Sequence, residues 1–330
     1  MTDAIRAGGL AKSFGDTRAL DGVDLTVPAG AVLGLLGPNG SGKTTTVRIL
    51  ATLLAPTSGR ASVAGYDVVE QAAEVRSIIG LTGQYAAVDG TLTGLENLMM
   101  VGRLLDLGRA DARRRAEELL DRFDLAEAGH RPVKTYSGGM QRRLDLALSI
   151  VGRPQVLFLD EPTTGLDPRS RAELWSIIRE LVGDGATVLL TTQYLDEADR
   201  LADTITVLDH GRVIAHGTSE ELKRQTGGQV LELRPADPAH LGAAAEALTS
   251  LSGGSPAVDR ESGLVAVAVE DASLVAAAVR RLDEAGVPIA DLALRGPSLD
   301  DVFLNLTGHR AETTPADEAS GDGRDQRSAA

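Results

Sequence analysis

Residues 37–44 have the residue types and the spacing of a loop that binds phosphate. They read Gly-Pro-Asn-Gly-Ser-Gly-Lys-Thr and match the pattern G-x-x-x-x-G-K-[ST]. In such a loop the glycines let backbone N–H groups turn toward phosphate oxygens, Lys43 reaches the β and γ phosphates, and Thr44 binds Mg²⁺. The alternative is a plain glycine-rich turn. We predict that the nucleotide is contacted by Gly37, Pro38, Asn39, Gly40, Ser41, Gly42, Lys43, Thr44 and Thr45.

Two adjacent carboxylates, Asp160 and Glu161, directly follow the apolar segment 156–159. In open α/β folds ligands bind at the carboxyl ends of the strands, so both side chains are placed where a nucleotide binds. Asp160 is suited to hold Mg²⁺. Glu161 is suited to orient or deprotonate the attacking water, a role that typically contributes about 10²–10⁴-fold to the rate. The alternative is that an acidic pair after a strand simply begins a helix.

A third segment, Ser137-Gly138-Gly139, lies between the phosphate loop and the acidic pair. It opens a predicted helix that carries Leu144 and Leu148. Ser137 is a suitable N-cap for this helix, and that is its plain structural interpretation.

The elements that position these residues follow a parallel α/β order. The apolar run 31–36 predicts a buried strand before the phosphate loop, and Val47, Leu50, Ala51 and Leu54 predict one face of the helix after it. Residues from about 94 to 150 have mostly helical periodicity. Strands at 156–159 and 187–191 then flank a helix with Leu174, Ile177, Ile178 and Leu181 on one side, and 205–214 form a hairpin.

The segment Tyr136-Ser137-Gly138-Gly139-Met140-Gln141, placed before a helix and ahead of the strand that ends in Asp160-Glu161, resembles the signature motif of ABC ATPases. The usual form of that motif is Leu-Ser-Gly-Gly-Gln. The resemblance covers about residues 3 to 220. It implies an α/β P-loop NTPase fold, an ABC ATPase domain with a helical subdomain at about 85–150, and ATP with Mg²⁺ as its ligands.

The resemblance also assigns roles to single residues outside the three motifs. It places Phe14 against adenine, where the alternative is a core phenylalanine. It places Gln84 in the loop that touches Mg²⁺ and faces a membrane partner, where the alternative is a polar loop residue. It places Asp167, within Gly165-Leu166-Asp167, at a dimer interface, where the alternative is a turn that enters a helix at Pro168.

One position departs from the family pattern. Most ABC ATPases have histidine after the strand that follows the Asp167 helix, whereas this chain has Gln193. A carboxamide donates a hydrogen bond to the γ-phosphate but does not become cationic as imidazole does. We predict that Gln193 senses the γ-phosphate without titrating, with helix capping as the alternative.

The strings Gln-Tyr-Leu-Asp-Glu-Ala-Asp at 193–199 and Pro-Ser-Leu-Asp-Asp-Val-Phe-Leu at 297–304 resemble the daunorubicin/doxorubicin-resistance subfamily of these ATPases. In that subfamily one chain hydrolyses ATP and another spans the membrane. The segment 297–307 is a proline-started amphipathic helix that contacts either the same chain or a partner. The subfamily implies export, and the cargo is left open among drugs, antibiotics, lipids and polysaccharides.

The sequence predicts an ABC ATPase domain at 1–224, a small α+β domain at 225–308 and a disordered tail at 309–330. The domain at 225–308 resembles a split-βαβ module. Its expected order is strand 229–234, helix 238–250, strand 256–259, turn 261–263, strand 264–269, helix 272–285 and strand 288–294.

Composition limits the surroundings in which the chain works. Hydrophobic residues at 43% and charged residues at 24% are ordinary for a globular protein, and a net charge of −14 argues against a nucleic-acid partner. No segment has the roughly 18 apolar residues of a membrane span, and the start lacks a signal pattern. We expect a cytoplasmic protein on the inner face of the membrane.

In the family's mechanism two copies bind ATP between them, so we expect a homodimer beneath a separate permease. Lys43, Thr44 and Asp160 of one copy and Ser137 and Gly139 of the other hold each ATP. The rivals are a soluble ABC ATPase that acts on ribosomes or DNA, a P-loop kinase, and an inactive interaction subunit. The first usually has two cassettes or a coiled-coil insertion, the second leaves the Ser137 motif unexplained, and the third conflicts with intact catalytic residues.

Overall fold

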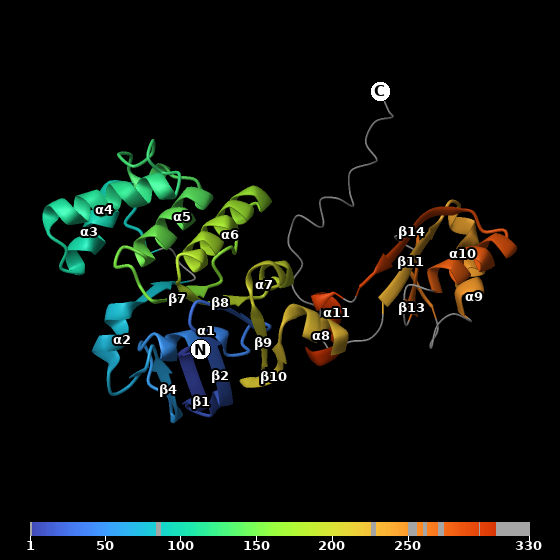
Figure 1. Cartoon of the computed structure of the whole chain (residues 1–330), viewed down its shortest axis with the longest axis horizontal. Coiled ribbons are helices and arrows are strands. Elements are labelled where there is room, and N and C mark those ends of the chain that lie inside the picture. The colour runs from blue at the N-terminus through green and yellow to red at the C-terminus, as the bar shows by residue number, and fades with distance from the viewer. Residues whose placement is uncertain are drawn as a thin grey trace. The chain divides into compact units, whose positions relative to one another are not determined.

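In the computed structural model of the chain, one six-stranded sheet carries the phosphate loop and both carboxylates. Figure 1 shows how its strands and the helices are arranged. The strand order is β10-β9-β3-β8-β7-β6, and all neighbours are parallel except β10 and β9. The structure describes residues 2–83, 87–225, 229–249, 256–259, 263–269, 274–296 and 298–307. The strands are β3 (Val32–Leu36), β6 (Ile79–Thr82), β7 (Val156–Asp160), β8 (Thr187–Thr192), β9 (Thr204–Asp209) and β10 (Arg212–Gly217).

The central strands are buried on both faces, which explains their continuous apolar runs. In β7, Val156 and Phe158 belong to one hydrophobic core, while Leu157 and Leu159 belong to the other. Successive side chains of a strand point to opposite faces, so each residue of the run has a core to fill. The prediction of a doubly buried parallel sheet is therefore confirmed.

A second, antiparallel sheet covers one face of the six-stranded sheet, and the parallel order expected from the sequence did not include it. Its strand order is β2-β1-β4-β5, and its inward residues, such as Ile5, Val23 and Val63, complete the core that contains Phe158. The alternation of Val23, Leu25 and Val27 is the period-two signal of a half-buried strand. The strands are β1 (Asp3–Phe14), β2 (Thr17–Pro28), β4 (Ser58–Val63) and β5 (Tyr66–Asp67).

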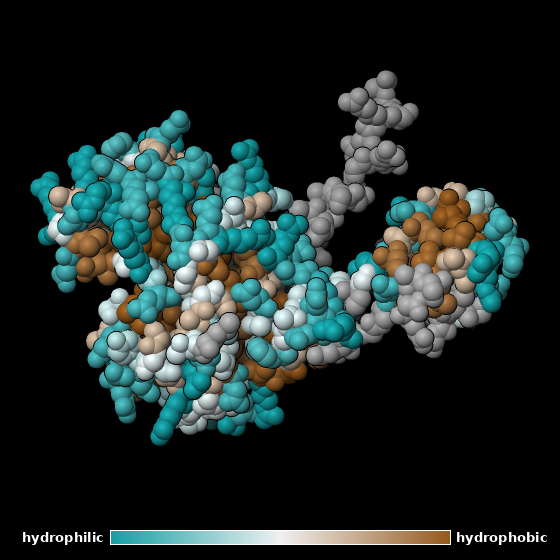
Figure 2. Space-filling view, in the orientation of Figure 1, coloured by the Kyte–Doolittle hydropathy of each residue, from teal (hydrophilic) through white to brown (hydrophobic). Residues whose placement is uncertain are grey.

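Helices cover the opposite face, and the helical content expected between about 94 and 150 is confirmed (Figure 1). Thr93 and Glu96 form a capping box that fixes the start of α3. The outer surface of this region is mostly hydrophilic (Figure 2), because residues such as Arg113 and Glu117 face solvent. The helices are α3 (Gly94–Leu104), α4 (Arg109–Arg122), the 3-10 turn η1 (Val133–Thr135), α5 (Gly138–Ser149) and α6 (Pro168–Gly183).

One helix is shorter than its apolar spacing predicted. The helix after the phosphate loop, α1 (Lys43–Leu50), ends before Leu54, because Thr52 has a φ of 63° that no α-helix accepts. Leu54 still packs against the core from outside the helix. The remaining helices of this part are α2 (Ala72–Ile78) and α7 (Leu195–Leu201).

The chain divides into two compact units at Ser219/Glu220, and the second unit has its own sheet and core. The sheet is antiparallel in the order β12-β13-β11-β14, with α9 and α10 contributing to its core, so the split-βαβ prediction is confirmed. The elements are α8 (Ser219–Gln225), β11 (Gln229–Pro235), η2 (Pro238–His240), α9 (Leu241–Thr249), β12 (Ala257–Asp259), β13 (Leu264–Val269), α10 (Leu274–Glu284), β14 (Ile289–Arg295) and α11 (Leu299–Thr307).

Several predictions concern residues that the structure does not describe. Gln84, Pro297, the first two residues of the turn at 261–263 and the tail at 309–330 lie outside the described residues. The amphipathic helix expected at 297–307 is α11. Its Val302 and Phe303 are buried, whereas Leu306 is exposed.

Candidate nucleotide-binding site

The backbone between β3 and α1 requires glycine at two positions. A Cβ atom on Gly37 would lie 2.2 Å from the backbone oxygen of Leu208, and one on Gly42 would lie 2.7 Å from that of Ala19. Gly42 also has a φ of 109° and is the N-cap of α1, with no side-chain capping bond. The N-cap residue itself therefore offers no side chain to the first N–H groups of α1, which is the arrangement that phosphate binding at a helix N-terminus uses.

The Lys43 side chain lies inside this loop and is only 4% exposed. Its Nζ donates to the backbone oxygens of Gly37 at 2.7 Å and Pro38 at 3.1 Å, and it lies 3.7 Å from Glu161 Oε1. Ser41 Oγ is buried and has no hydrogen-bond partner among the described residues. A buried cation and an unsatisfied hydroxyl in a glycine-lined loop fit an anion such as phosphate.

Asp160, the last residue of β7, lies beside Thr44, the second residue of α1. Thr44 Oγ1 donates to Asp160 Oδ1 at 3.2 Å, and Thr191 Oγ1 from β8 donates to the same oxygen at 2.6 Å. Hydroxyl and carboxylate oxygens are the ligands that Mg²⁺ prefers, and magnesium sites combine one or two of them with substrate phosphates. Thr44 and Asp160 therefore fit a magnesium ion, and magnesium binding itself stays a prediction.

Glu161 follows in a strained backbone conformation. Its φ is 50°, in the left-handed region that residues other than glycine rarely adopt. Its N–H donates to both the backbone oxygen and Oγ1 of Thr191 at 3.1 Å, and its Oε2 accepts from Thr164 Oγ1 at 3.5 Å. Strain of this kind persists where surrounding contacts fix the backbone, and it concentrates at functional sites. The structure thus brings Lys43, Thr44, Asp160 and Glu161 together.

The segment Ser137-Gly138-Gly139 lies at the start of α5. Ser137 is the N-cap of α5 and accepts from the Met140 N–H at 3.2 Å, which matches the capping interpretation. Ser137 and Gly138 are exposed, and no hydrogen bond or ion pair recorded within the described residues joins them to the phosphate loop. Gly139 is buried, and a Cβ atom there would lie 2.6 Å from Ser170 Oγ. The exposed end of α5 is therefore free to contact another molecule.

Phe14 and Asp167 lie at the surface of the first unit. Phe14 ends β1, is 51% exposed, and has Lys12 Nζ 5.3 Å from the centre of its ring, so it is not a core phenylalanine. Asp167 caps α6 by accepting from the N–H groups of Arg169 and Ser170, as in a turn that enters a helix. Hydrogen bonds from Ser170 lower the pKa of Asp167. The roles assigned to Phe14 and Asp167 stay predictions.

Gln193 directly follows β8, two residues after Thr191. Its Oε1 is buried and has no hydrogen-bond partner among the described residues. The N-cap of α7 is Tyr194, with no side-chain capping bond, so Gln193 does not cap that helix. This buried carboxamide oxygen, next to the carboxyl end of β8, is available to accept a hydrogen bond from a ligand. Whether that ligand is the γ-phosphate stays a prediction.

Two residues that the sequence reasoning missed hold the site together. Thr191 bonds both Asp160 and Glu161, and Arg142 of α5 donates to the backbone oxygens of both residues. A polar residue at the carboxyl end of a buried strand was the available signal for Thr191. Arg142 had no such signal, because an arginine three residues before an aspartate in a helix is equally typical of a solvated face.

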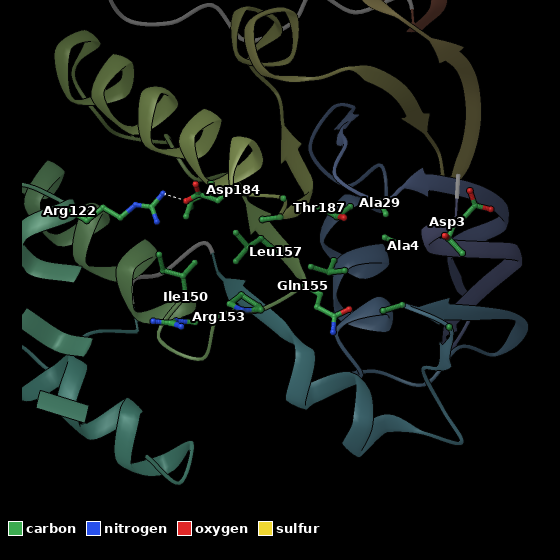
Figure 3. Close-up of a pocket in the computed structure, with 18 of the residues that line it drawn as sticks. Asp3, Ala4, Ala29, Arg122, Ile150, Arg153, Gln155, Leu157, Asp184 and Thr187 are labelled. Carbon is green, nitrogen blue, oxygen red and sulfur yellow. Dashed lines mark hydrogen bonds and ion pairs between the residues drawn. The ribbon is translucent and has the colours of Figure 1, made fainter. Parts of the chain in front are cut away.

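A separate cavity of about 700 Å³ lies at the opposite edge of the sheet, at the amino ends of β7 and β8 (Figure 3). Its lining includes Gln155, Leu157 and Thr187 and none of the predicted site residues. Charged groups at its rim are paired, as in the bond of 2.6 Å from Arg122 to Asp184. This cavity is therefore distinct from the phosphate loop.

Fold and site together define an ATP-binding cassette, the ATP-hydrolysing part of ABC transporters. Residues 20–164 match the family described as ABC transporter, and residues 217–307 match the C-terminal domain of DrrA1-3-like ATP-binding proteins. The daunorubicin resistance ATP-binding protein DrrA2 of Streptomyces coeruleorubidus is 55% identical over 318 residues, which are 96% of this chain and 99% of that protein. The chain belongs to the ABC transporter ATP-binding proteins of the DrrA subfamily.

Other similarities support the same assignment. The daunorubicin/doxorubicin resistance ATP-binding protein DrrA of Streptomyces peucetius is 52% identical, with 97% of each chain covered. A nucleotide-free ATP-binding cassette from an ABC transporter superposes with a TM-score of 0.62 at 26% identity, covering 68% of this chain and 94% of the other. The predicted family and fold are confirmed, and the chain is an ATPase whose hydrolysis is coupled to transport. Such a subunit associates with a permease, and none of the described helices has the length and apolarity needed to span a bilayer.

Proposed function

We propose that two copies of this chain enclose ATP and Mg²⁺ between them and drive efflux through a separate permease. The observation that carries this proposal is the division of the site. Lys43, Thr44, Asp160 and Glu161 are within contact of one another, whereas Ser137 lies exposed at the start of α5 without a bond to them. A second copy that offers its Ser137 and Gly139 would complete the site.

Each group has one task in the proposed reaction. The N-terminal N–H groups of α1 and Lys43 bind the β and γ phosphates, and Phe14 stacks on adenine. Thr44 and Asp160 hold Mg²⁺, with Gln84 as a further contact, and the ion when bound neutralises phosphate charge. Glu161 orients the attacking water and accepts its proton, while Gln193 donates to the γ-phosphate. Asp167 contacts the second copy.

The cargo is proposed from the names of the relatives. Two of them are daunorubicin resistance proteins, and a relative from Ralstonia nicotianae, 38% identical, is named as a Nod factor export ATP-binding protein. We assign to this chain a drug, an antibiotic or another hydrophobic compound as cargo. The chain then works at the inner face of the membrane, with residues 1–224 as the ATPase domain and 225–308 as an accessory domain.

The dimer is tested with Glu161→Gln, which keeps the shape of the side chain but removes the base. With saturating Mg-ATP, sedimentation should give a species of twice the 34.4 kDa chain, because ATP is bound and not hydrolysed. The matched control is Glu117→Gln, on the exposed face of α4, which should hydrolyse ATP and return to the monomer. A Glu161→Gln protein that stays monomeric both alone and with its permease would contradict the proposal.

The cargo is tested separately. The permease that co-purifies with the chain is reconstituted with it in vesicles, and ATP hydrolysis is measured with anthracyclines and with lipids. Stimulation by an anthracycline and not by lipid supports drug export, and the reverse result contradicts it.

A further inference from the structure

Arg142 holds the backbone at the point where the catalytic carboxylates leave the sheet. This residue of α5 is 7% exposed. Its Nε donates to the backbone oxygen of Pro162 at 2.6 Å, and its Nη2 donates to those of Glu161 at 2.8 Å and Asp160 at 3.3 Å. Three consecutive carbonyl groups are therefore fixed by one guanidinium from another element.

The same side chain, together with Asp145 one turn later, binds Gly83 and Ala87, the described residues on either side of 84–86. Arg142 Nη1 donates to the backbone oxygen of Gly83 at 2.8 Å, and Asp145 Oδ1 accepts from the N–H of Ala87 at 2.8 Å. The two side chains are joined by a contact of 3.3 Å between Nη1 and Asp145 Oδ2. One ion pair on α5 thus connects the acidic pair to the flanks of the segment that contains Gln84.

The chemistry of the pair explains why these residue types are used. A guanidinium has five N–H donors in a rigid planar fork, and here four carbonyl groups and one carboxylate accept from it. An ammonium has three donors on a flexible stem and does not reproduce this geometry. All the carbonyl acceptors belong to the backbone, so Arg142 determines main-chain position.

Burying the ion pair of Arg142 and Asp145 costs desolvation free energy that apolar side chains would not cost. Burial raises the pKa of Asp145 against the opposing effects of the Ala87 bond and Arg142, so desolvation outweighs the pairing. Apolar residues of similar volume often stabilise a fold as well or better. Glu161, whose backbone oxygen Arg142 binds, has the strained φ of 50°, and strain persists only where the surroundings impose it.

We propose that Arg142 and Asp145 are positioning residues that hold Glu161 for catalysis and connect it mechanically to Gly83 and Ala87, the residues on either side of 84–86. Because α5 begins at Ser137, the same pair also transmits a movement of the signature segment to Glu161. The connection to the permease rests on the function proposed above and on the family resemblance, which places Gln84 in a loop that faces that partner.

The first test separates catalysis from nucleotide binding. Arg142→Lys keeps the charge but loses the planar fork, and we expect kcat for ATP to fall about 10- to 100-fold, the usual effect of a small misplacement of a catalytic group. The dissociation constant for ATP should change by less than about twofold, because Arg142 does not contact the phosphate loop. If Arg142→Lys fails to fold, the double variant R142Q/D145N, which removes both buried charges, takes its place.

The second test concerns the connection to the permease. Asp145→Asn keeps an oxygen that accepts from Ala87, whereas Asp145→Ala removes it. In the reconstituted complex we expect the ratio of permease-stimulated to basal hydrolysis to fall to near one in Asp145→Ala and to be largely retained in Asp145→Asn. The control is Arg113→Lys, from an exposed ion pair on α4, which should change neither kcat nor the ratio.

The outcomes separate this proposal from the proposed function. A wild-type complex that neither hydrolyses ATP nor responds to a permease contradicts the function. An active wild type with an unchanged kcat in Arg142→Lys contradicts the positioning role, as does an equal loss of kcat, ATP affinity and thermal stability. Equal stimulation ratios in Asp145→Ala and Asp145→Asn contradict the connection to Gly83 and Ala87.

Discussion

Thr191 bonds both Asp160 and Glu161, the two carboxylate residues to which we assign catalytic roles, and its removal is the sharpest test of the proposed site. Its hydroxyl donates to Asp160 Oδ1 at 2.6 Å and accepts from the Glu161 N–H at 3.1 Å. The substitution Thr191→Val keeps the shape of the side chain and removes the hydroxyl, so it deletes these bonds without opening a cavity. Thr187, the first residue of the same strand, is equally buried and accepts from the Gly30 N–H at 2.9 Å.

The two hydrogen bonds of the Thr191 hydroxyl contribute unequally to the free energy of unfolding. A hydrogen bond to a charged group contributes about 1.5–3 kcal/mol, so losing the bond to Asp160 costs ~2 kcal/mol. The Glu161 N–H keeps the backbone oxygen of Thr191 as a partner, so losing the second bond adds little. For a unit of this size ~2 kcal/mol lowers Tm by about 4–8 °C. Thr187→Val removes a bond between neutral groups, which costs about 1 kcal/mol.

The assay uses the single tryptophan of the chain, Trp175, whose fluorescence reports on the unfolding of the first unit alone. Hydrolysis of Mg-ATP is measured on the same samples. We expect kcat/KM to fall about 10- to 100-fold in Thr191→Val, the usual effect of removing a residue that orients a metal ligand. Thr187→Val should keep wild-type hydrolysis. The reasoning fails if Thr191→Val retains full activity, or if both variants lose activity equally.

Three further predictions concern other residues of the first unit. Gln193→Ala should lower turnover, and the wild-type pH–rate profile should lack a histidine limb between about pH 6 and 7; unchanged turnover in the variant removes the proposed γ-phosphate contact. Gly139→Ala should weaken ATP-driven dimerisation, because the new Cβ would lie 2.6 Å from Ser170 Oγ, and sedimentation with Mg-ATP checks this. Burial raises the pKa of Glu197, so the folded chain keeps this proton to higher pH than the unfolded chain does. The free energy of unfolding should therefore fall as pH rises from the ordinary glutamate pKa to the raised pKa. Glu197→Gln, which keeps an acceptor for Trp175 Nε1, should lose this dependence and unfold at higher temperature than wild type at mildly alkaline pH, and an unchanged pH dependence of Tm would exclude Glu197 as its source.

The phosphate loop and the acidic pair were predictable because their signals are local. A buried strand, a glycine-rich turn and a helix follow one another within residues 31–50, and the parallel sheet then places Asp160 beside Thr44. The second unit was predictable for the same reason, since its strands and helices alternate regularly.

The supporting residues were not predictable from local pattern. Thr191 belongs to a run of strand-forming residues, and only the pairing of β7 with β8 places its hydroxyl at Asp160. Arg142 has the residue type of a solvated helix face, and only tertiary structure reveals the carbonyl groups around it. The end of α1 at Leu50 depends on a backbone turn at Thr52 that the apolar spacing does not encode.

The side chains of β7 alternate between two cores, and this limits which mutations of the gene the strand can tolerate. Conservative replacements of Val156 or Leu157 alter one core at a time and leave the strand in place. An in-frame insertion or deletion within the strand instead exchanges the two sets of apolar side chains and moves Asp160 by one position relative to Thr191. Natural relatives with a working ATPase should therefore vary in the composition of this strand while preserving its length to the residue.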